Sequence, residues 1–211
     1  MSDDGVVRGD DGVARCAWGD STPDYRVYHD TEWGMPAGDD VVLFEKLSLE
    51  AFQSGLSWLT ILRKREDFRR AFKGFDVERV ARFGARDVER LMNDSSIVRN
   101  RLKIEAVVNN ARCAVELVDS EGSLAAYVWG FEPAQRDRPL DRAALAKLSL
   151  TPESTALAKD LKRRGWRFVG PTTVYAFMQA MGLVNDHLDG CDAYDLVARA
   201  RRRFKRPRGG S

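Results

Sequence analysis

Residues 151–182, TPESTALAKDLKRRGWRFVGPTTVYAFMQAMG, predict two consecutive helices joined by a short turn. Thr151 followed by Pro152 is typical of a helix start, because threonine caps the first turn and proline fits its first position. Gly165 should end this helix, since glycine readily adopts the left-handed conformation found there. The second helix should span about residues 171–181. The stretch therefore predicts a helical hairpin.

The remaining sequence also has helical periodicity, without convincing strand alternation. A helix capped by Asp39 or Asp40 should extend toward Gly55, and Asp76 and Asp87 mark the starts of two short helices. From about residue 97, apolar residues recur at three- and four-residue spacing: Ile104, Val107, Val108, Ala111, Val115 and Val118. These patterns predict an all-α fold, with a polar connection at about residues 133–150.

The composition is that of one globular protein. A chain of 211 residues with 44% hydrophobic residues can bury a sizeable core. Three cysteines are too few for a disulfide framework, and no apolar run approaches the roughly 20 residues of a membrane span. The N-terminus carries no cleavable apolar segment. We therefore expect a cytoplasmic protein that does not contact a membrane.

The net charge of +2 hides an uneven distribution along the chain. Residues 1–14 are rich in aspartate, including Asp3 and Asp4, and residues 196–211 are rich in arginine and lysine. Such runs are typical of solvated, disordered extensions. We expect both to lie outside a folded domain at residues 15–195. A nucleic-acid tether is the alternative interpretation of the basic tail.

Both histidines of the chain lie near cysteines, one pair at each end of the sequence. Cys16 and His29 are separated by twelve residues, and His187 and Cys191 by three, a common spacing of metal ligands. Four protein ligands would complete a tetrahedral, structural zinc site. Four buried side chains without metal are the alternative, but the pairwise clustering favours zinc. Cys113 lies opposite the apolar stripe of its helix and is not an expected ligand.

The turn of the C-terminal hairpin is a candidate DNA-binding element. It resembles the helix-hairpin-helix element, in which a Gly-x-Gly turn enters a helix whose free N–H groups favour phosphate. The first glycine is missing, replaced near Arg167. A simple helical hairpin with solvated basic residues remains an equal alternative at this point. The DNA-binding candidates are Arg167, Gly170, Pro171, Thr172 and Thr173.

Glu50 lies on a helix with little polar surface, so its carboxylate needs a partner or a function. An internal salt bridge to an arginine is the usual explanation. The functional alternative is a pocket that stacks a flat, electron-poor heterocycle beside the acid. Tyrosines and tryptophans near the predicted metal ligands favour the pocket: Trp18, Tyr25, Tyr28, Trp33 and Trp58.

Together these residues resemble the DNA-3-methyladenine glycosylase I family over about residues 15–194. Matches occur in the same order and spacing: Arg15-Cys16-Ala17-Trp18, Tyr28-His29-Asp30-Thr31-Glu32-Trp33-Gly34-Met35-Pro36, Leu49-Glu50-Ala51-Phe52-Gln53-Ser54-Gly55-Leu56-Ser57-Trp58, Phe168-Val169-Gly170-Pro171-Thr172-Thr173, Phe177-Met178-Gln179-Ala180 and Val184-Asn185-Asp186-His187. The resemblance implies a two-lobed helix-hairpin-helix glycosylase, with the hairpin at about residues 153–182. Its terminal segments would be joined by a structural zinc.

The resemblance also implies function. The protein would be a monofunctional, monomeric hydrolase of bacterial type that removes 3-methyladenine from double-stranded alkylated DNA in nucleoid base-excision repair. Glu50 would hydrogen-bond the flipped base, Trp58 would stack on it, and Tyr25, Tyr28 and Gln53 would line the pocket. Related enzymes place a catalytic aspartate shortly after the hairpin, which this family is thought to lack. Asp186 is therefore not expected to catalyse.

The implied chemistry needs little acid catalysis. Methylation at N3 makes adenine cationic, so the glycosidic bond is already activated. Aromatic faces and a carboxylate complement such a base. Two other functional classes compete with this one. A non-enzymatic DNA-binding protein would not explain a buried acid beside aromatic rings. A zinc hydrolase or deaminase would need an open metal position and a His-x-Glu signature with Cys-x-x-Cys, which the sequence lacks.

Overall fold

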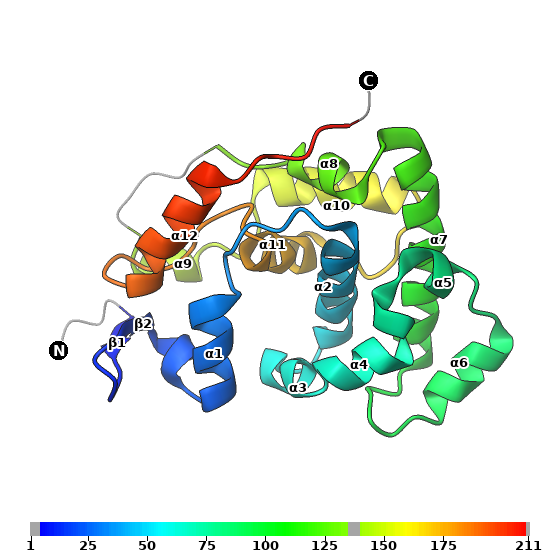
Figure 1. The fold of residues 1–211 in the computed structure, drawn as a ribbon, viewed down its shortest axis with the longest axis horizontal. Helices are drawn as coiled ribbons and strands as arrows, with labels where there is room; N and C mark the ends of the chain where they lie inside the picture. The colour runs from blue at the N-terminus through cyan, green and yellow to red at the C-terminus, as the bar shows by residue number, and fades with distance from the viewer. Residues whose placement is uncertain (1–4, 135–139, 210–211) are drawn as a thin grey trace.

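The computed structural model describes residues 5–134 and 140–209 (Figure 1). Asp3 and Asp4 of the predicted acidic extension and the last two residues of the basic tail lie outside these ranges. The helices, 3₁₀ turns (η) and strands follow in chain order: β1 (Val6–Arg8), β2 (Ala14–Cys16), η1 (Ala17–Asp20), α1 (Pro23–Thr31), α2 (Asp40–Gln53), α3 (Trp58–Arg63), α4 (Arg65–Ala71), η2 (Lys73–Phe75), α5 (Val77–Ala81), α6 (Ala85–Met92), α7 (Arg101–Glu121), α8 (Leu124–Trp129), α9 (Arg142–Ala146), α10 (Pro152–Arg163), α11 (Pro171–Ala180) and α12 (Asp192–Arg203).

Polar side chains that cap the first turn fix most helix starts. The Asp39 carboxylate accepts a hydrogen bond from the backbone N–H of Val42 and begins α2, as the sequence predicted. Thr151 caps α10 in the same way. Helix α7 begins after the cap residue Asn100, slightly later than the periodicity indicated. Asp87 lies within the first turn of α6 and accepts from the N–H of Gly84, so it does not itself start that helix.

The structure confirms a mostly helical fold and adds one small sheet. Strands β1 and β2 pair antiparallel, with Val6 opposite Cys16. Each strand has three residues. Such short strands cannot establish a detectable alternation of apolar and polar residues, so they could not be predicted from the residue pattern. Their pairing places Cys16 in a fixed, fully buried position.

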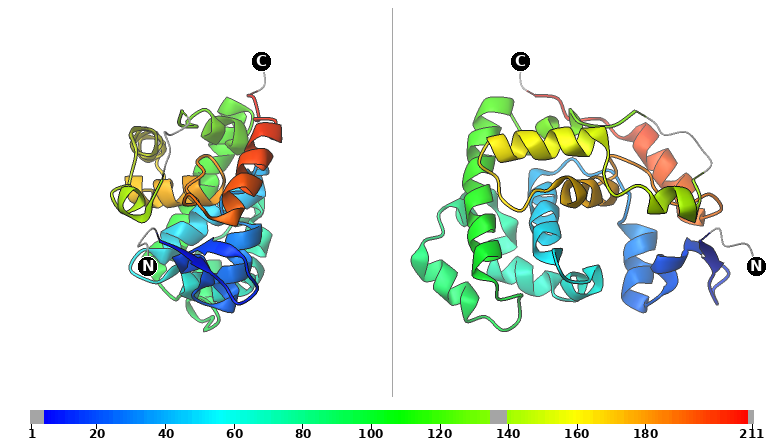
Figure 2. Two further views of the ribbon diagram at one scale, coloured as in Figure 1. Left: turned by 90° about the vertical axis from the view of Figure 1, so that its left-hand side faces the viewer. Right: turned by 180° about the vertical axis from the view of Figure 1, so that it is seen from behind.

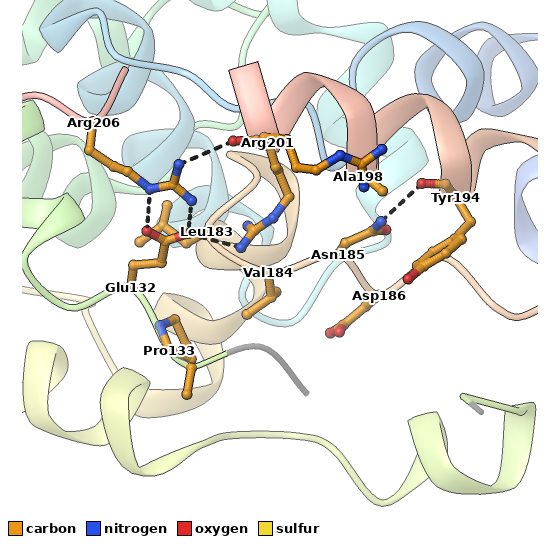
Figure 3. A pocket seen from close by; sticks show the side chains of 12 residues that line it. Glu132, Pro133, Leu183, Val184, Asn185, Asp186, Tyr194, Ala198, Arg201 and Arg206 are labelled. Carbon is orange, nitrogen blue, oxygen red and sulfur yellow. Dashed lines mark hydrogen bonds and ion pairs between the residues drawn. The ribbon is translucent and has the colours of Figure 1, made fainter. Parts of the chain in front are cut away.

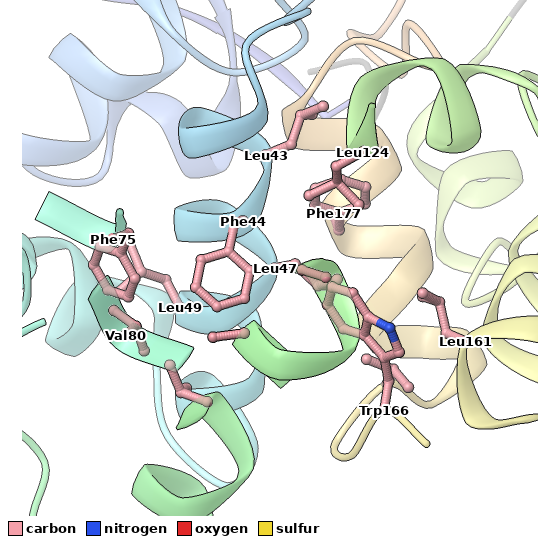
Figure 4. Close-up of a cluster of buried hydrophobic side chains, with 14 of the residues drawn as sticks. Leu43, Phe44, Leu47, Leu49, Phe75, Val80, Leu124, Leu161, Trp166 and Phe177 are labelled. Atoms are coloured by element: carbon pink, nitrogen blue, oxygen red, sulfur yellow. The ribbon is translucent and has the colours of Figure 1, made fainter. Parts of the chain in front are cut away.

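Helix α2 lies at the centre of the molecule and packs against α11, α7 and α8. Helix α10 packs along α11, as Figure 2 shows from behind. The core between these helices is apolar, with Phe44 of α2, Phe177 of α11 and Trp166 of the hairpin all buried (Figure 4). This packing holds the α10–α11 hairpin rigidly against the helix that carries Glu50.

A smaller buried cluster lies where the two ends of the chain meet. Cys16, Leu188 and Cys191 form its centre, and it includes Leu140 and Ala193. In Figure 1, β1, β2 and α1 lie beside α9 and α12 on the side away from α7. The first and last parts of the sequence therefore meet around the predicted metal ligands.

The C-terminal basic segment differs from the disordered tail that the sequence suggested. The predicted boundary after residue 195 lies inside α12, whose Ala193 and Val197 are buried. The ring of Phe204 lies 4.6 Å from that of Trp129, centroid to centroid. The amphipathic spacing of α12 was masked by its many arginines. No helix among the described residues is both long and apolar enough to cross a bilayer.

Candidate functional site

The four predicted metal ligands come together in one buried cluster. One ligand atom from each of Cys16, His29, His187 and Cys191 lies within 4.8 Å of the other three. The Cys191 Sγ atom lies 3.5 Å from His29 Nε2 and 3.5 Å from His187 Nδ1, and Cys16 Sγ lies 3.9 Å from the latter. This group could hold a metal ion through two sulfur and two nitrogen atoms.

The second ring nitrogen of each histidine is turned away from the cluster and has its own acceptor. His29 Nδ1 lies 2.8 Å from the Asp30 carboxylate, and His187 Nε2 lies 3.0 Å from the Trp33 carbonyl. A proton on each outer nitrogen leaves a lone pair on the nitrogen that faces the sulfurs. This orientation of histidines by outer acceptors is characteristic of metal sites.

Charges around the cluster are paired. The buried guanidinium of Arg15 donates to Asp30 at 2.7 Å and to Asp11 at 2.7 Å. Cys16 and the imidazoles of His187 and His29 lower the pKa of Cys191, so this thiol is the readier of the two to become a thiolate. Gly19 leaves room for the His29 ring, because a Cβ there would lie 2.5 Å from it. Residues close to the ligands in the sequence thus help to hold them in position.

Aromatic rings connect this cluster to the predicted base pocket. The ring of Trp18 meets those of His29 and Trp33 edge-on, with centroids 5.1 Å and 5.0 Å away. The same indole lies 5.6 Å from Tyr25 and 6.3 Å from Tyr28, centroid to centroid. Tyr28 and His29 are successive residues of α1, so the metal cluster and the pocket share one helix.

Glu50 is buried on α2, and its partner is a lysine rather than the expected arginine. Lys46 Nζ lies 2.8 Å from Glu50 Oε1, one helical turn earlier on the same helix. The ammonium also donates to the Tyr28 hydroxyl at 2.8 Å and lies 3.3 Å from the centroid of the Trp58 ring. Carboxylate, phenol and indole therefore surround one positive charge.

Other predicted pocket residues are less closely involved. The Tyr25 hydroxyl accepts from the backbone N–H of Leu59 at 3.0 Å and thus ties α1 to α3. The Trp58 indole N–H is buried and has no hydrogen-bond partner among the described residues. Gln53 is the last residue of α2 and is half-buried, and its side chain forms no hydrogen bond within the described ranges. Trp33 lies beside the metal cluster, with its ring centroid 4.7 Å from that of His187.

The α10–α11 turn presents the N-terminus of α11, as predicted. Gly170 is the N-cap residue and Pro171 the first helical residue, and Thr172 is exposed. In the Gly-x-Gly pattern the missing glycine corresponds to Phe168, which has a left-handed φ of 56° and is 38% exposed. A bulky residue rarely adopts this conformation, so the surrounding structure must hold the turn in place.

Basic side chains near the turn fall into two groups. Arg163 and Arg164 pair with Asp160, and Arg164 also pairs with Glu121. Arg167 and Lys162 are exposed, and neither forms an ion pair within residues 5–134 and 140–209. Only the second group has charges that remain available to a phosphate.

Comparison with known proteins identifies the family of this chain. A family model described as methyladenine glycosylase matches residues 18–194. The chain belongs to the methyladenine glycosylase family. This confirms the family predicted from the sequence, and with it the enzyme class, a glycosylase that hydrolyses N-glycosyl bonds.

The similarity to individual relatives of this glycosylase extends over almost the whole length of each relative. DNA-3-methyladenine glycosylase 1 of Escherichia coli is 45% identical over 86% of this chain and 97% of its own. The DNA-3-methyladenine glycosylase of Haemophilus influenzae is 44% identical over 85% and 97%, respectively. The solved structure of 3-methyladenine DNA glycosylase I from Staphylococcus aureus, described for its recognition of 3-methyladenine, is 38% identical over 85% of this chain and 96% of that one, with a TM-score of 0.80.

A separate cavity of this glycosylase lies between α12 and the segment that follows α11 (Figure 3). It has a volume of about 480 Å³, and Glu132, Asp186 and Arg201 are among its lining residues. Asp186 is buried and accepts hydrogen bonds from Tyr175 and, at 2.9 Å, from Gln179. These contacts give it a structural role in holding the chain after α11.

Lys46 is the residue of the site to which the sequence analysis assigned no role. Its signal was the four-residue spacing to Glu50 on a helix with little polar surface, which brings the two side chains together. Sequence alone could not place Tyr28 and Trp58, from two other helices, around the same ammonium. That arrangement depends on tertiary packing.

Proposed function

We propose that this glycosylase removes 3-methyladenine from alkylated double-stranded DNA, as a monofunctional enzyme of base-excision repair. One observation carries the proposal: Glu50, Tyr28 and Trp58 surround a positive charge, that of Lys46, with contacts of 2.8, 2.8 and 3.3 Å. The base that methylation has made cationic needs the same surroundings. Aromatic faces attract a cation and a carboxylate pairs with it.

The enzyme would act on a base flipped out of the duplex. Extruding a nucleotide costs a few kcal/mol, and least for a damaged, weakly paired base. Glu50 would then hydrogen-bond the base and Trp58 would stack on it, while Tyr25, Tyr28, Trp18 and Gln53 line the slot. Trp33 would support that slot from the metal side. The unpaired indole N–H of Trp58 supports this proposal, because it leaves a buried donor available to a ligand.

The α10–α11 hairpin would hold the DNA backbone, as the helix-hairpin-helix element of a two-lobed fold. The candidates are Arg167, whose charge is not neutralised by a described ion pair, and residues 170–173 at the start of α11. Free N–H groups and the helix dipole at this end favour a phosphate. The relatives are bacterial, so we also infer that the protein acts on nucleoid DNA in the cytoplasm. That it acts as a monomer remains a prediction from the sequence.

Zinc is the metal that best fits the Cys16, His29, His187 and Cys191 cluster. A tetrahedral zinc with ligands at about 2.0–2.3 Å keeps its ligand atoms about 3.3–3.8 Å apart. Of the four sulfur–nitrogen distances, two are 3.5 Å and fall in this range, and a third is 3.9 Å, just above it. Four protein ligands would leave no open coordination position, so the metal would stabilise the junction of the chain ends rather than activate water.

Identification of the released base tests the proposed activity directly. The protein is incubated with methylated duplex DNA, and the free bases are separated and identified by mass spectrometry. We expect 3-methyladenine from the wild type, and a large loss of excision with retained DNA affinity for Glu50→Gln. Glu45→Gln on the same helix is the matched control, since Glu45 pairs with Arg69 and lies outside the slot. No free 3-methyladenine, or unchanged excision by folded Glu50→Gln, would contradict the proposal.

A further inference from the structure

Lys46 occupies the space between the groups that are proposed to bind the base. Its ammonium contacts Glu50, the Tyr28 hydroxyl and the face of the Trp58 ring at once. The Lys46 side chain is 7% exposed and that of Glu50 is 6% exposed. A flat base cannot stack on the same face of Trp58 and reach the same carboxylate oxygen while the ammonium stays there.

Lys46 balances the charge of Glu50, and another cation could take its place beside that carboxylate. Arg65 and Glu32, the other charged groups that act on Lys46, pair with each other at 2.9 Å and add no net charge. Burial lowers the pKa of Lys46, whereas the charge of Glu50 opposes that shift. A buried carboxylate left without a cation is costly, so the slot favours whichever positive charge fills it.

We propose that Lys46 is an affinity-setting residue of the base slot, a resident cation that an incoming base must displace from Glu50 and Trp58. This inference rests on the proposed function, because it requires Glu50 and Trp58 to be the base-binding groups. Displacement exchanges one positive charge for another when the base is methylated. An uncharged base would instead leave Glu50 without a cation among aromatic rings.

The resident ammonium also sets the affinity of the slot. A ligand that binds only the open state has its affinity reduced by the fraction of molecules in which the slot is open. With Lys46 in place for about 90–99% of the time, removal of its charge would raise the affinity about 10- to 100-fold. Any ligand that needs the vacated space should gain by a similar factor, whatever its charge.

Two small probes that share the 3-methylated adenine ring separate displacement from simple repulsion. 3,9-Dimethyladeninium carries a fixed positive charge and has no glycosidic bond to break, and 3-methyladenine as the free base is uncharged. Their affinities are measured by calorimetry at a pH where the free base is neutral, for the wild type, Lys46→Met and Lys64→Met. Lys64 donates to the Ser96 carbonyl at 2.9 Å, outside the slot, and serves as the matched lysine control.

The pattern of affinities decides the proposal. We expect Lys46→Met to bind both probes about 10- to 100-fold more tightly than the wild type, and Lys64→Met to bind like the wild type. A gain for the cation alone would show that Lys46 stays in place and merely repels, which overturns displacement. No gain for either probe would overturn it as well.

The wild-type protein provides a second measurement, which decides the matter even if Lys46→Met does not fold. Buried Lys46 should react slowly with acetic anhydride, and saturation with 3,9-dimethyladeninium should increase its acetylation severalfold in peptide mass spectra. Unchanged or reduced acetylation would contradict displacement. If the wild type releases 3-methyladenine from DNA but fails these tests, only this inference is lost. A protein that releases no base and binds neither probe would instead refute the proposed function.

Discussion

Both atoms of the Asn110 side-chain amide bond the backbone of Arg167. Asn110 Nδ2 donates to the Arg167 carbonyl at 2.9 Å, and its Oδ1 accepts from the Arg167 N–H at 2.8 Å. Asn110 is buried in α7. Its neighbour Asn109 donates through Nδ2 to the Gly165 carbonyl at 2.8 Å, and at longer distances to Asn110 Oδ1 and Cys113 Sγ. Helix α7 thus holds the turn in which Phe168 has its left-handed conformation.

Asn110→Asp should destabilise the protein by about 2–3 kcal/mol, because it removes a donor and places a carboxylate against the Arg167 carbonyl. Urea unfolding measures the change. Asn109→Ala is the control and should cost about 0.5–1.5 kcal/mol, since it removes the more exposed bond to Gly165 and leaves both Asn110 bonds to Arg167 in place. Equal losses in the two variants would show that the paired contact is not what fixes the turn.

Asp30→Ala should weaken metal binding about 10- to 100-fold, because His29 would lose the acceptor that orients its ring. Competition with a coloured chelator measures the affinity. Asp10→Ala, which removes a mostly exposed partner of Arg26, should leave the affinity unchanged. Equal metal affinity in Asp30→Ala and the wild type would show that Asp30 does not orient His29 for metal binding.

The purified protein should contain one zinc per chain, and a strong chelator should lower its stability. A metal present at about 1,000 times its dissociation constant adds about 4 kcal/mol to folding. Cys191→Ser should lose the metal, whereas Cys113→Ser should keep it, because Cys113 lies outside the cluster. Metal analysis and thermal unfolding would contradict the proposal if the two cysteine variants behaved alike.

Arg167→Ala should lower the affinity for duplex DNA and reduce the slope of log affinity against log salt by about 1, as expected for one lost phosphate contact. Lys162→Ala should behave similarly if it also reaches the backbone. Arg164→Ala should chiefly reduce stability, since Arg164 is paired with Asp160 and Glu121. Fluorescence anisotropy at several salt concentrations separates these effects. A change in slope for Arg164→Ala alone would be the opposite of this expectation.

Acid should remove part of the stability through Asp160. Hydrogen bonds from Arg164 and Arg163 hold the pKa of this carboxyl well below its usual range. The unfolded chain therefore binds more protons, and the contribution of Asp160 is present above about pH 4 and declines as the pH falls. Asp160→Asn should flatten the pH dependence of urea unfolding in this range. An unchanged slope would show that other carboxylates dominate.

Local sequence signals predicted the helices best. Asp39 and Thr151 begin α2 and α10 as predicted, because a cap and its first turn involve neighbouring residues only. The β1–β2 pair and α12 could not be predicted from such local signals. Their stability comes from distant contacts, such as the ion pair between Arg201 and Glu132 at 2.9 Å.

The candidate site could be predicted in part. One cysteine–histidine pair near each end of the chain was sufficient to group Cys16 with His187, which the structure confirms. The pocket roles of Glu50 and Trp58 remain predictions. The position of Lys46 depends on how α1 and α3 pack against α2, which no local pattern encodes.

The junction of Cys16 with Cys191 has a topological consequence. With the cluster closed, the backbone between these residues becomes a loop that contains nearly every helix. Local unfolding that starts at either terminus should then stop at this cluster. Neither end of the chain can unfold past it on its own. Trimming by exopeptidases should accordingly halt at this point from both directions.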